Sequence, residues 1–157
     1  MWGGSEGLKN CKGERIGAGP RSVNFAIWWD GDLLRELLNS NRIEKWDWQK
    51  GVLNTIFTAD GCVANNGSKS TPSLSADLFG DWREEVVFRT ADNKELRIYT
   101  TTIPTTHRLY TLMHDPQYRL SIAWQNVAYN QPPHVSFYLG DGMAKPPRAR
   151  MFVPSAR

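Results

Sequence analysis

Short apolar segments separated by polar turns are the clearest pattern along this chain. From residue 85 on, β-branched and aromatic residues gather in short runs, and the turn-forming stretches "ADNK", "IPTT" and "HDPQ" lie between them. Helix-periodic runs with clear caps are scarce. The pattern therefore predicts an all-β fold that contains an antiparallel meander, with strands at residues 85–89, 95–102, 107–113 and 119–125.

The chain also contains an internal repeat. "GDLLRELL" at 31–38 and "GDWREEVV" at 80–87 share a Gly-Asp pair, a glutamate four residues after the aspartate, and two apolar residues after the glutamate. Asp32 and Asp81 are 49 positions apart, and one four-stranded propeller blade takes about 40–50 residues. We therefore expect a β-propeller of four-stranded antiparallel sheets. About three blades fit into 157 residues, whereas propellers have about four to eight, so further blades are expected from a longer chain.

Composition and charge exclude several classes of protein. Hydrophobic residues make up 40% and charged residues 22%, which is ordinary globular usage rather than that of a disordered chain. The net charge of +3 comes from residues 144–157, which hold four of the 19 basic residues and no acid. The rest carries 15 basic and 16 acidic residues. We therefore divide the chain into a propeller part, 1–143, and a Pro-rich basic tail, 144–157, and expect no nucleic-acid partner.

Other common sites and signals are missing from the sequence. No apolar stretch reaches the roughly 18 residues of a membrane span, and the N-terminus lacks the basic and apolar regions of a signal peptide. The three histidines show no metal-ligand spacing, and there is no Gly-rich phosphate loop or G-x-S-x-G motif. Cys11 and Cys62 fit no zinc pattern, which leaves either a disulfide or two free thiols.

The repeated aspartate and glutamate suggest calcium. In the second copy, Asp77, Asp81 and Glu85 match positions one, five and nine of a calcium loop, and Asp32 and Glu36 are their counterparts in the first copy. Calcium takes six to eight oxygen ligands, which carboxylates on a tight turn can supply.

A second explanation for the same residues needs no metal. Phe79 and Trp82 stand where a calcium loop has an acid or amide and a glycine. The aspartates could instead cap the turn through backbone N–H groups, with the glutamates paired to Arg35 or Arg83. Another oxygen-rich run, "QNVAYNQPP" at 125–133, offers the amides of Asn126 and Asn130 as further metal ligands or as an Asx-type turn.

The polar run "NNGSKSTPS" at 65–73 has a single lysine, Lys69, near its centre. A lysine in such a run is usually a solvated turn residue, because Asn, Gly, Ser and Pro favour turns. Taken alone, the run predicts an exposed loop and no chemistry.

Long strings of this sequence resemble a known family. "NNGSKSTPSLSADLFGDWREEVVFRT", the segment from "LRIYTTT" to "YLGDGM", and "VNFAIWWDGDLLRELL" are similar to the C-terminal part of the bacterial rhamnogalacturonan lyases of polysaccharide lyase family 11. The resemblance covers about residues 1–143. It implies a secreted, calcium-containing, eight-bladed β-propeller that cleaves the rhamnogalacturonan I backbone of pectin. Family members are several times longer, so this chain resembles a C-terminal fragment whose partners are the remaining blades.

The resemblance also gives a role to the polar loops. Lys69 matches a family lysine implicated in catalysis, and Tyr129 matches a tyrosine placed against the sugar. Together they imply β-elimination at galacturonate, with Lys69 as general base and Tyr129 as substrate platform or proton donor. The implied substrate-binding residues are Asn66, Gly67, Ser68 and Asn130.

Two other functions fit the same residues. The chain could be a calcium-dependent module that binds an acidic glycan without cleaving it, or a structural or adhesive propeller. Lys69 favours the enzyme, because binding alone needs no base. The family's further arginine and metal ligands lie outside this chain, so activity of the 157 residues alone does not follow. Endo or exo cleavage does not follow from the sequence either.

Overall fold

The computed structural model describes residues 7–125, 127 and 130–146. Antiparallel sheets dominate this part of the chain, and helix is a minor component, which confirms the all-β prediction at that level. A two-stranded sheet comes first, formed by β1 (Leu8–Lys9) and β2 (Arg15–Gly17). The first four-stranded sheet has β3 (Phe25–Ile27), β4 (Glu36–Asn39), β5 (Arg42–Asp47) and β6 (Val52–Thr58).

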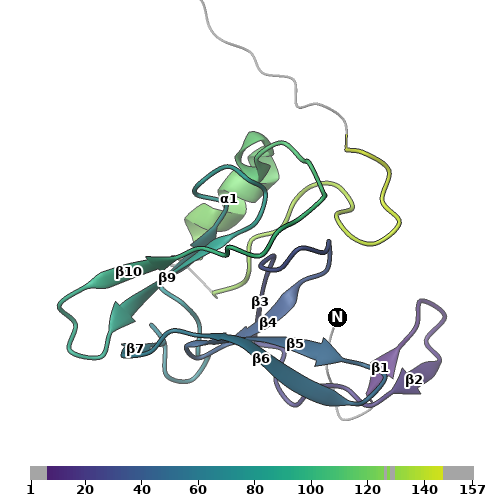
Figure 1. The fold of residues 1–157 in the computed structure, drawn as a ribbon, viewed down its shortest axis with the longest axis horizontal. Coiled ribbons are helices and arrows are strands. Elements are labelled where there is room, and N and C mark those ends of the chain that lie inside the picture. The colour runs from purple at the N-terminus through teal and green to yellow at the C-terminus, as the bar shows by residue number, and fades with distance from the viewer. Residues whose placement is uncertain (1–6, 126, 128–129, 147–157) are drawn as a thin grey trace, which may run out of the picture.

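The second four-stranded sheet has β7 (Cys62–Val63), β8 (Leu74–Ala76), β9 (Glu85–Thr90) and β10 (Leu96–Tyr99). The first sheet is a simple meander in chain order. In the second, β9 pairs with all three other strands. Residues 86–89 of β9 lie opposite β10. The first part of β9 also pairs with β8, and its last two residues pair with β7. The two sheets are seen with their connections in Figure 1.

The predicted repeat is present in the strand register. Phe25 of β3 lies opposite Leu38 of β4, and 49 positions later Leu74 of β8 lies opposite Val87 of β9. Each first strand also ends opposite the repeated glutamate, Glu36 or Glu85. The repeat therefore corresponds to two strand pairs with the same register, each joined by an acidic loop.

Two predicted strands, 107–113 and 119–125, are wrong. Residues 112–114 form the 3₁₀ helix η1 (Leu112–His114), and α1 runs over Pro116–Trp124. The "HDPQ" stretch predicted as a turn starts that helix, because the Asp115 side chain accepts a bond from the Gln117 N–H at 3.0 Å and Pro116 stands in the first helical turn. Burial follows helical spacing, since Tyr118 and Ser121 are buried while Leu120 is 62% exposed.

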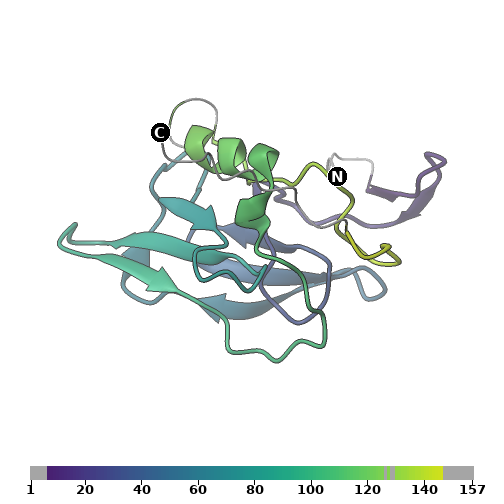
Figure 2. The same cartoon turned by 90° about the horizontal axis from the view of Figure 1, so that it is seen from above.

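Two apolar clusters hold the elements together. One cluster lies between the four-stranded sheets and contains Phe25, Ile27, Trp29, Leu38, Ile43, Ala59, Cys62, Val86 and Phe88. The other packs η1, α1 and the C-terminal described segment against the acidic loops, through Trp28, Leu33, Trp82, Leu112 and Tyr118. Figure 2 shows α1 lying over the sheets on one side of the molecule. Burial of these large side chains provides most of the stabilisation of the fold.

The end of α1 is attached to the edge of β8. The side-chain amide of Gln125 accepts a bond from the Ser75 N–H at 2.9 Å and donates one to the Ser75 carbonyl at 2.6 Å. Gln125 and Ser75 are both buried. The amide therefore satisfies backbone groups that an adjacent strand would otherwise pair with.

Cys11 is exposed and Cys62 is buried, and both are free thiols, so the alternative without a disulfide is the one observed. Over the described residues, no helix has the length and apolar character needed to cross a bilayer. The predicted tail, 144–157, is described only up to residue 146.

Candidate active site

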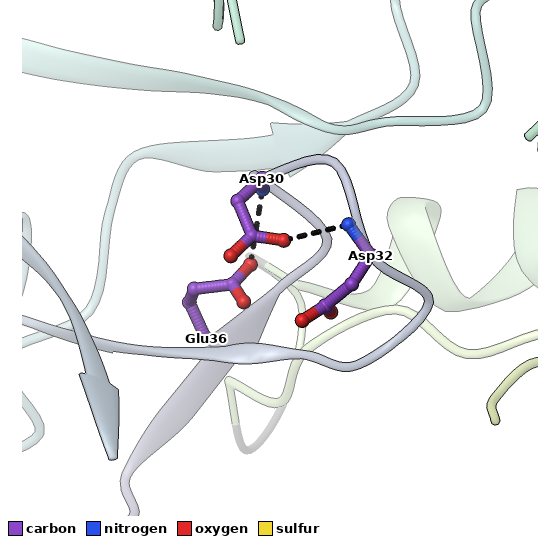
Figure 3. A group of neighbouring side chains, drawn as sticks. All are labelled: Asp30, Asp32 and Glu36. Atoms are coloured by element: carbon purple, nitrogen blue, oxygen red, sulfur yellow. Dashed lines mark hydrogen bonds between the residues drawn. The ribbon is translucent and has the colours of Figure 1, made fainter. Parts of the chain in front are cut away.

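Three carboxylates converge in the first acidic loop. One oxygen from each of Asp30, Asp32 and Glu36 lies within 4.8 Å of the others, as Figure 3 shows. Glu36 is placed by backbone bonds, because its Oε2 accepts from the N–H groups of Trp29 at 2.9 Å and Asp30 at 3.2 Å. The Asp30 side chain in turn accepts from the Asp32 N–H at 2.9 Å. The prediction named Asp32 and Glu36 but missed Asp30, although the sequence "DGD" contains it.

Lys45 of β5 reaches into this cluster. Its Nζ contacts carboxylate oxygens of Asp30 and Asp32 closely and lies 3.1 Å from Oε1 of Glu36. Burial, and then the nearby Asp30 carboxylate, raises the pKa of Glu36 to about 7, while Lys45 opposes this rise. Partial burial disfavours the charge on Lys45, but its bonds to Asp30 and Asp32 keep its pKa above the ordinary value. The lysine is therefore cationic at neutral pH.

The second acidic loop uses its repeated glutamate in the same way. Oε2 of Glu85 accepts from the N–H groups of Leu78 at 2.8 Å and Phe79 at 3.0 Å, the counterparts of Trp29 and Asp30. Its Oε1 accepts from the hydroxyl of Thr100 at 2.9 Å. The glutamate therefore fastens the strand entrance in both repeats, which is a structural function of its own.

The two aspartates of the second loop are bonded separately. Asp77 accepts from the Gly80 N–H at 2.8 Å, the Thr111 hydroxyl at 2.7 Å and the Leu112 N–H at 2.8 Å. Asp81 pairs with Arg83 at 2.6 Å. The turn-capping contacts agree with the alternative without metal, since Asp81 also accepts from the Arg83 N–H at 3.1 Å. The arginine contact differs from that alternative, because Arg83 pairs with Asp81 and not with the glutamate, Glu85, which is bonded to Thr100. Among the described residues, Asp30, Asp32 and Glu36 make the only converging acidic group.

A buried polar network connects the two loops to α1. Oε2 of Glu84 accepts from the Trp28 N–H at 3.0 Å, and its Oε1 accepts from the Tyr118 hydroxyl at 2.7 Å. That hydroxyl also accepts from the Asp77 N–H at 2.9 Å. Arg35 lies over the Trp28 ring, 3.7 Å from its centroid, with Nη2 3.9 Å from Glu84. The sequence prediction missed this network, because Glu84 and Tyr118 become neighbours only in the fold.

The loop that carries Lys69 is organised by Asn66. The side-chain oxygen of Asn66 accepts from the N–H and hydroxyl of Ser68, both at 3.0 Å, and from the Lys69 N–H at 2.9 Å. All three bonds go to the side-chain oxygen of Asn66, and its amide nitrogen takes part in none of them. Gly67 is exposed, and a Cβ added there would meet nothing within 4 Å. Lys69 itself is half-buried, whereas a solvated turn lysine would be exposed.

The fold brings this loop to Asn130. The Asn65 N–H donates to the Thr71 carbonyl at 2.8 Å, which closes the loop, and Nδ2 of Asn130 donates to the Thr71 hydroxyl at 2.9 Å. Thr71 is fully buried. Arg35 donates to the Pro133 carbonyl and so holds the far end of the same segment. Sequence reasoning missed Thr71, because it is one more hydroxyl residue beside the serines of a polar run.

Two of the predicted site residues, Tyr129 and Asn126, lie outside the described residues. Asn130, the chain neighbour of Tyr129, is described, and its side-chain oxygen is buried without a hydrogen-bond partner in the described part of the chain. The structure therefore connects Asn130, through Thr71, to the loop that holds the predicted residues 66–69, and leaves the two acidic loops as a separate group of residues.

Comparison with known proteins gives consistent matches. The family described as "Rhamnogalacturonan lyase family 11, C-terminal domain" matches residues 1–149. The chain is 69% identical over 148 residues to the rhamnogalacturonan endolyase YesW of Bacillus subtilis (strain 168), which covers 94% of this chain and 24% of that protein. It is 58% identical over 164 aligned residues to the rhamnogalacturonan exolyase YesX of the same organism, covering 99% of this chain and 27% of that protein.

Solved structures give the same result for the fold. The crystal structure of rhamnogalacturonan lyase YesW superposes with a TM-score of 0.90 at 68% identity, over 96% of this chain and 26% of that one. A rhamnogalacturonan lyase of Bacillus licheniformis gives a TM-score of 0.86 at 64% identity, over 90% and 24%. The chain thus spans about a quarter of the length of the relatives it matches.

Proposed function

The chain belongs to rhamnogalacturonan lyase family 11, in its C-terminal domain, and on this basis we propose that it forms part of an enzyme that cleaves the rhamnogalacturonan I backbone of pectin by β-elimination. The proposal rests on the hydrogen bond from Asn130 to Thr71, which connects Asn130 to the loop that holds Lys69. Two segments that are about 60 residues apart in the chain form one polar region there, and one of them holds a half-buried lysine.

The reaction requires three events at one galacturonate residue. A base removes the proton from C5, the C4–O4 bond breaks as a C4–C5 double bond forms, and O4 receives a proton as it leaves. We assign the base to the side-chain amine of Lys69 and the proton donor, or the surface for the sugar ring, to Tyr129. Asn66 fixes the backbone of Lys69 by accepting its N–H, and so limits the positions that the amine can take.

Substrate contacts are assigned to residues that border the same loop. Gly67 allows a sugar to approach the backbone because no atom lies near its missing Cβ. Asn66 and Ser68 are exposed residues on the same turn, and we assign the amide nitrogen of Asn66 and the hydroxyl of Ser68 to the sugar. Asn130 contributes an amide whose nitrogen is held by Thr71.

We extend the proposal to the architecture and its partners. The equal register of the β3–β4 and β8–β9 pairs at a 49-residue spacing supports two blades of a β-propeller. The other blades would come from the rest of a longer lyase, since the relatives are about four times as long. Because the substrate is a polysaccharide of plant cell walls, we propose that the enzyme is secreted.

Calcium does not fit the two acidic loops as they are folded. The ammonium group of Lys45 occupies the centre of the first carboxylate cluster, and the carboxylates of the second are bonded to separate groups of the protein. The proposed reaction therefore does not depend on calcium at these loops, and the predicted calcium requirement of the enzyme stays a prediction.

The test is an activity assay on a grafted enzyme. This chain replaces the matching segment of the B. subtilis endolyase, to which it is 69% identical over 148 residues, and absorbance of the new unsaturated uronate is followed on rhamnogalacturonan I. We expect Lys69→Ala to abolish the signal. Lys94→Ala is the matched control, because the Lys94 side chain is 81% exposed and its ion pair is with Asp92, a neighbour in its turn.

Two results would speak against the proposal. If Lys69→Ala were as active as the unchanged graft, Lys69 would not be the base. If the unchanged graft bound immobilised rhamnogalacturonan but did not cleave it, the chain would be a glycan-binding module instead.

A further inference from the structure

We propose that the ammonium group of Lys45 takes the place of a metal cation in the first acidic loop, so that this loop folds without calcium. The inference concerns the stability of the fold and does not depend on the proposed lyase activity. It starts from the cluster of Asp30, Asp32 and Glu36, whose carboxylates lie within 4.8 Å of one another. Three negative groups at such distances repel one another unless a cation lies between them.

Lys45 supplies that cation from outside the loop. It lies on β5, the strand next to β4, on which Glu36 lies. Its Nζ contacts all three carboxylates, and an ammonium group has three donors, one for each of them. A lysine on the adjacent strand therefore offsets the negative charge of the loop, and each N–H donor of its ammonium group has a carboxylate partner.

The second repeat supplies an internal comparison. Phe79 stands 49 positions after Asp30, so the second loop has one carboxylate fewer at the equivalent place. There the repeated glutamate receives its remaining bond from Thr100, a neutral hydroxyl on the strand connection after β10. A lysine is thus bonded to the three converging acids of the first loop, and a neutral hydroxyl is bonded to the glutamate of the second loop, whose acids do not converge.

The same position cannot hold both cations. Calcium needs six to eight oxygen ligands at 2.3–2.6 Å, and the oxygens that face the centre of this loop are already bonded to Nζ of Lys45. A calcium ion could enter only after Lys45 had left, because the two positive charges would repel each other. Calcium should consequently have little effect on this loop while Lys45 is present.

The experiment counts bound calcium with mass spectrometry and measures thermal stability, in the intact chain and in parallel in the grafted enzyme. In the presence of Lys45, Asp32→Asn should leave the calcium content unchanged. Lys45→Met should lower the melting temperature in the presence of chelator. Added calcium should then raise the melting temperature of Lys45→Met by more than it raises that of the unchanged protein. Lys50→Met is the control, since the Lys50 side chain is 78% exposed and its ion pair is with Asp47, three residues before it.

Each outcome is decisive. A loss of one calcium per chain in Asp32→Asn would show that the loop binds calcium despite Lys45 and would overturn the proposal. A Lys45→Met protein that is as stable as the unchanged one, or that calcium fails to stabilise, would also overturn it, because Lys45 would then not be acting as the cation of the loop. Equal behaviour of Lys45→Met and Lys50→Met would have the same meaning.

Discussion

Replacing Tyr118 with phenylalanine removes one hydroxyl group from the buried network between α1 and the acidic loops. Tyr118 is fully buried, and its hydroxyl donates to Glu84 at 2.7 Å and accepts from the Asp77 N–H at 2.9 Å. A hydrogen bond to a charged group contributes about 1.5–3 kcal/mol, and a buried donor left without a partner costs about 1–3 kcal/mol. We therefore expect Tyr118→Phe to lower the free energy of unfolding by about 3–5 kcal/mol.

The loss should also depend on pH. Burial raises the pKa of Glu84 above its usual 4.5, while Arg35 and the Tyr118 hydroxyl oppose the rise. Without that hydroxyl the folded-state pKa rises further. A carboxyl group whose pKa is higher in the folded than in the unfolded state binds more protons when folded, so stability is lost as pH rises above the unfolded value. The destabilisation by Tyr118→Phe should therefore be larger near pH 8 than near pH 5.

Urea unfolding followed by tryptophan fluorescence at the two pH values measures both effects. Leu120→Ala is the control on the same helix, because Leu120 is 62% exposed and should lose little at either pH. A loss below about 1 kcal/mol for Tyr118→Phe, the typical net value of one ordinary hydrogen bond, would refute the magnitude. A loss that is equal at both pH values would refute the role assigned to Glu84.

Two further predictions concern the proposed active site. Gly67→Ala should raise the free energy of unfolding by about 0.4–1 kcal/mol, since the added Cβ meets nothing within 4 Å. The same methyl group should block the sugar and raise KM in the uronate assay. An unchanged KM would show that Gly67 is not part of the substrate site. Thr71→Val should release Asn130 and so lower kcat by more than its effect on the melting temperature accounts for. Thr71→Ser should recover kcat, and equal kcat for the valine and serine variants would contradict this.

Much of the fold could be predicted because its signal is local and repeated. The 49-residue spacing of the Gly-Asp motifs predicted a repeated strand unit, and the equal register of the β3–β4 and β8–β9 pairs agrees with it. The repeat does not extend to the whole sheet, because the first sheet is a meander in chain order and the second is not. The error at 119–125 arose because alternating apolar residues imitate a strand when a helix buries only part of its surface. The Asp115-Pro116 cap was the signal that could have corrected it.

The candidate site could be predicted only in part. Lys69 was singled out by its polar surroundings and by family resemblance, whereas Lys45 carried no local mark as the partner of Asp30 and Asp32. Its role depends on the pairing of β5 with β4, which brings residues 9 to 15 positions apart into contact. Thr71 and Asn130 are 59 positions apart and were likewise joined by tertiary structure alone.

The amide of Gln125 has a consequence for how the second sheet can grow. By bonding to both backbone groups of Ser75 it acts as a one-residue substitute for a neighbouring strand, so a strand from another molecule could add at β8 only by displacing it. The other side of the sheet, β10, has mostly exposed side chains, including Leu96 and Ile98. Unwanted strand addition, and with it aggregation, is therefore directed to β10.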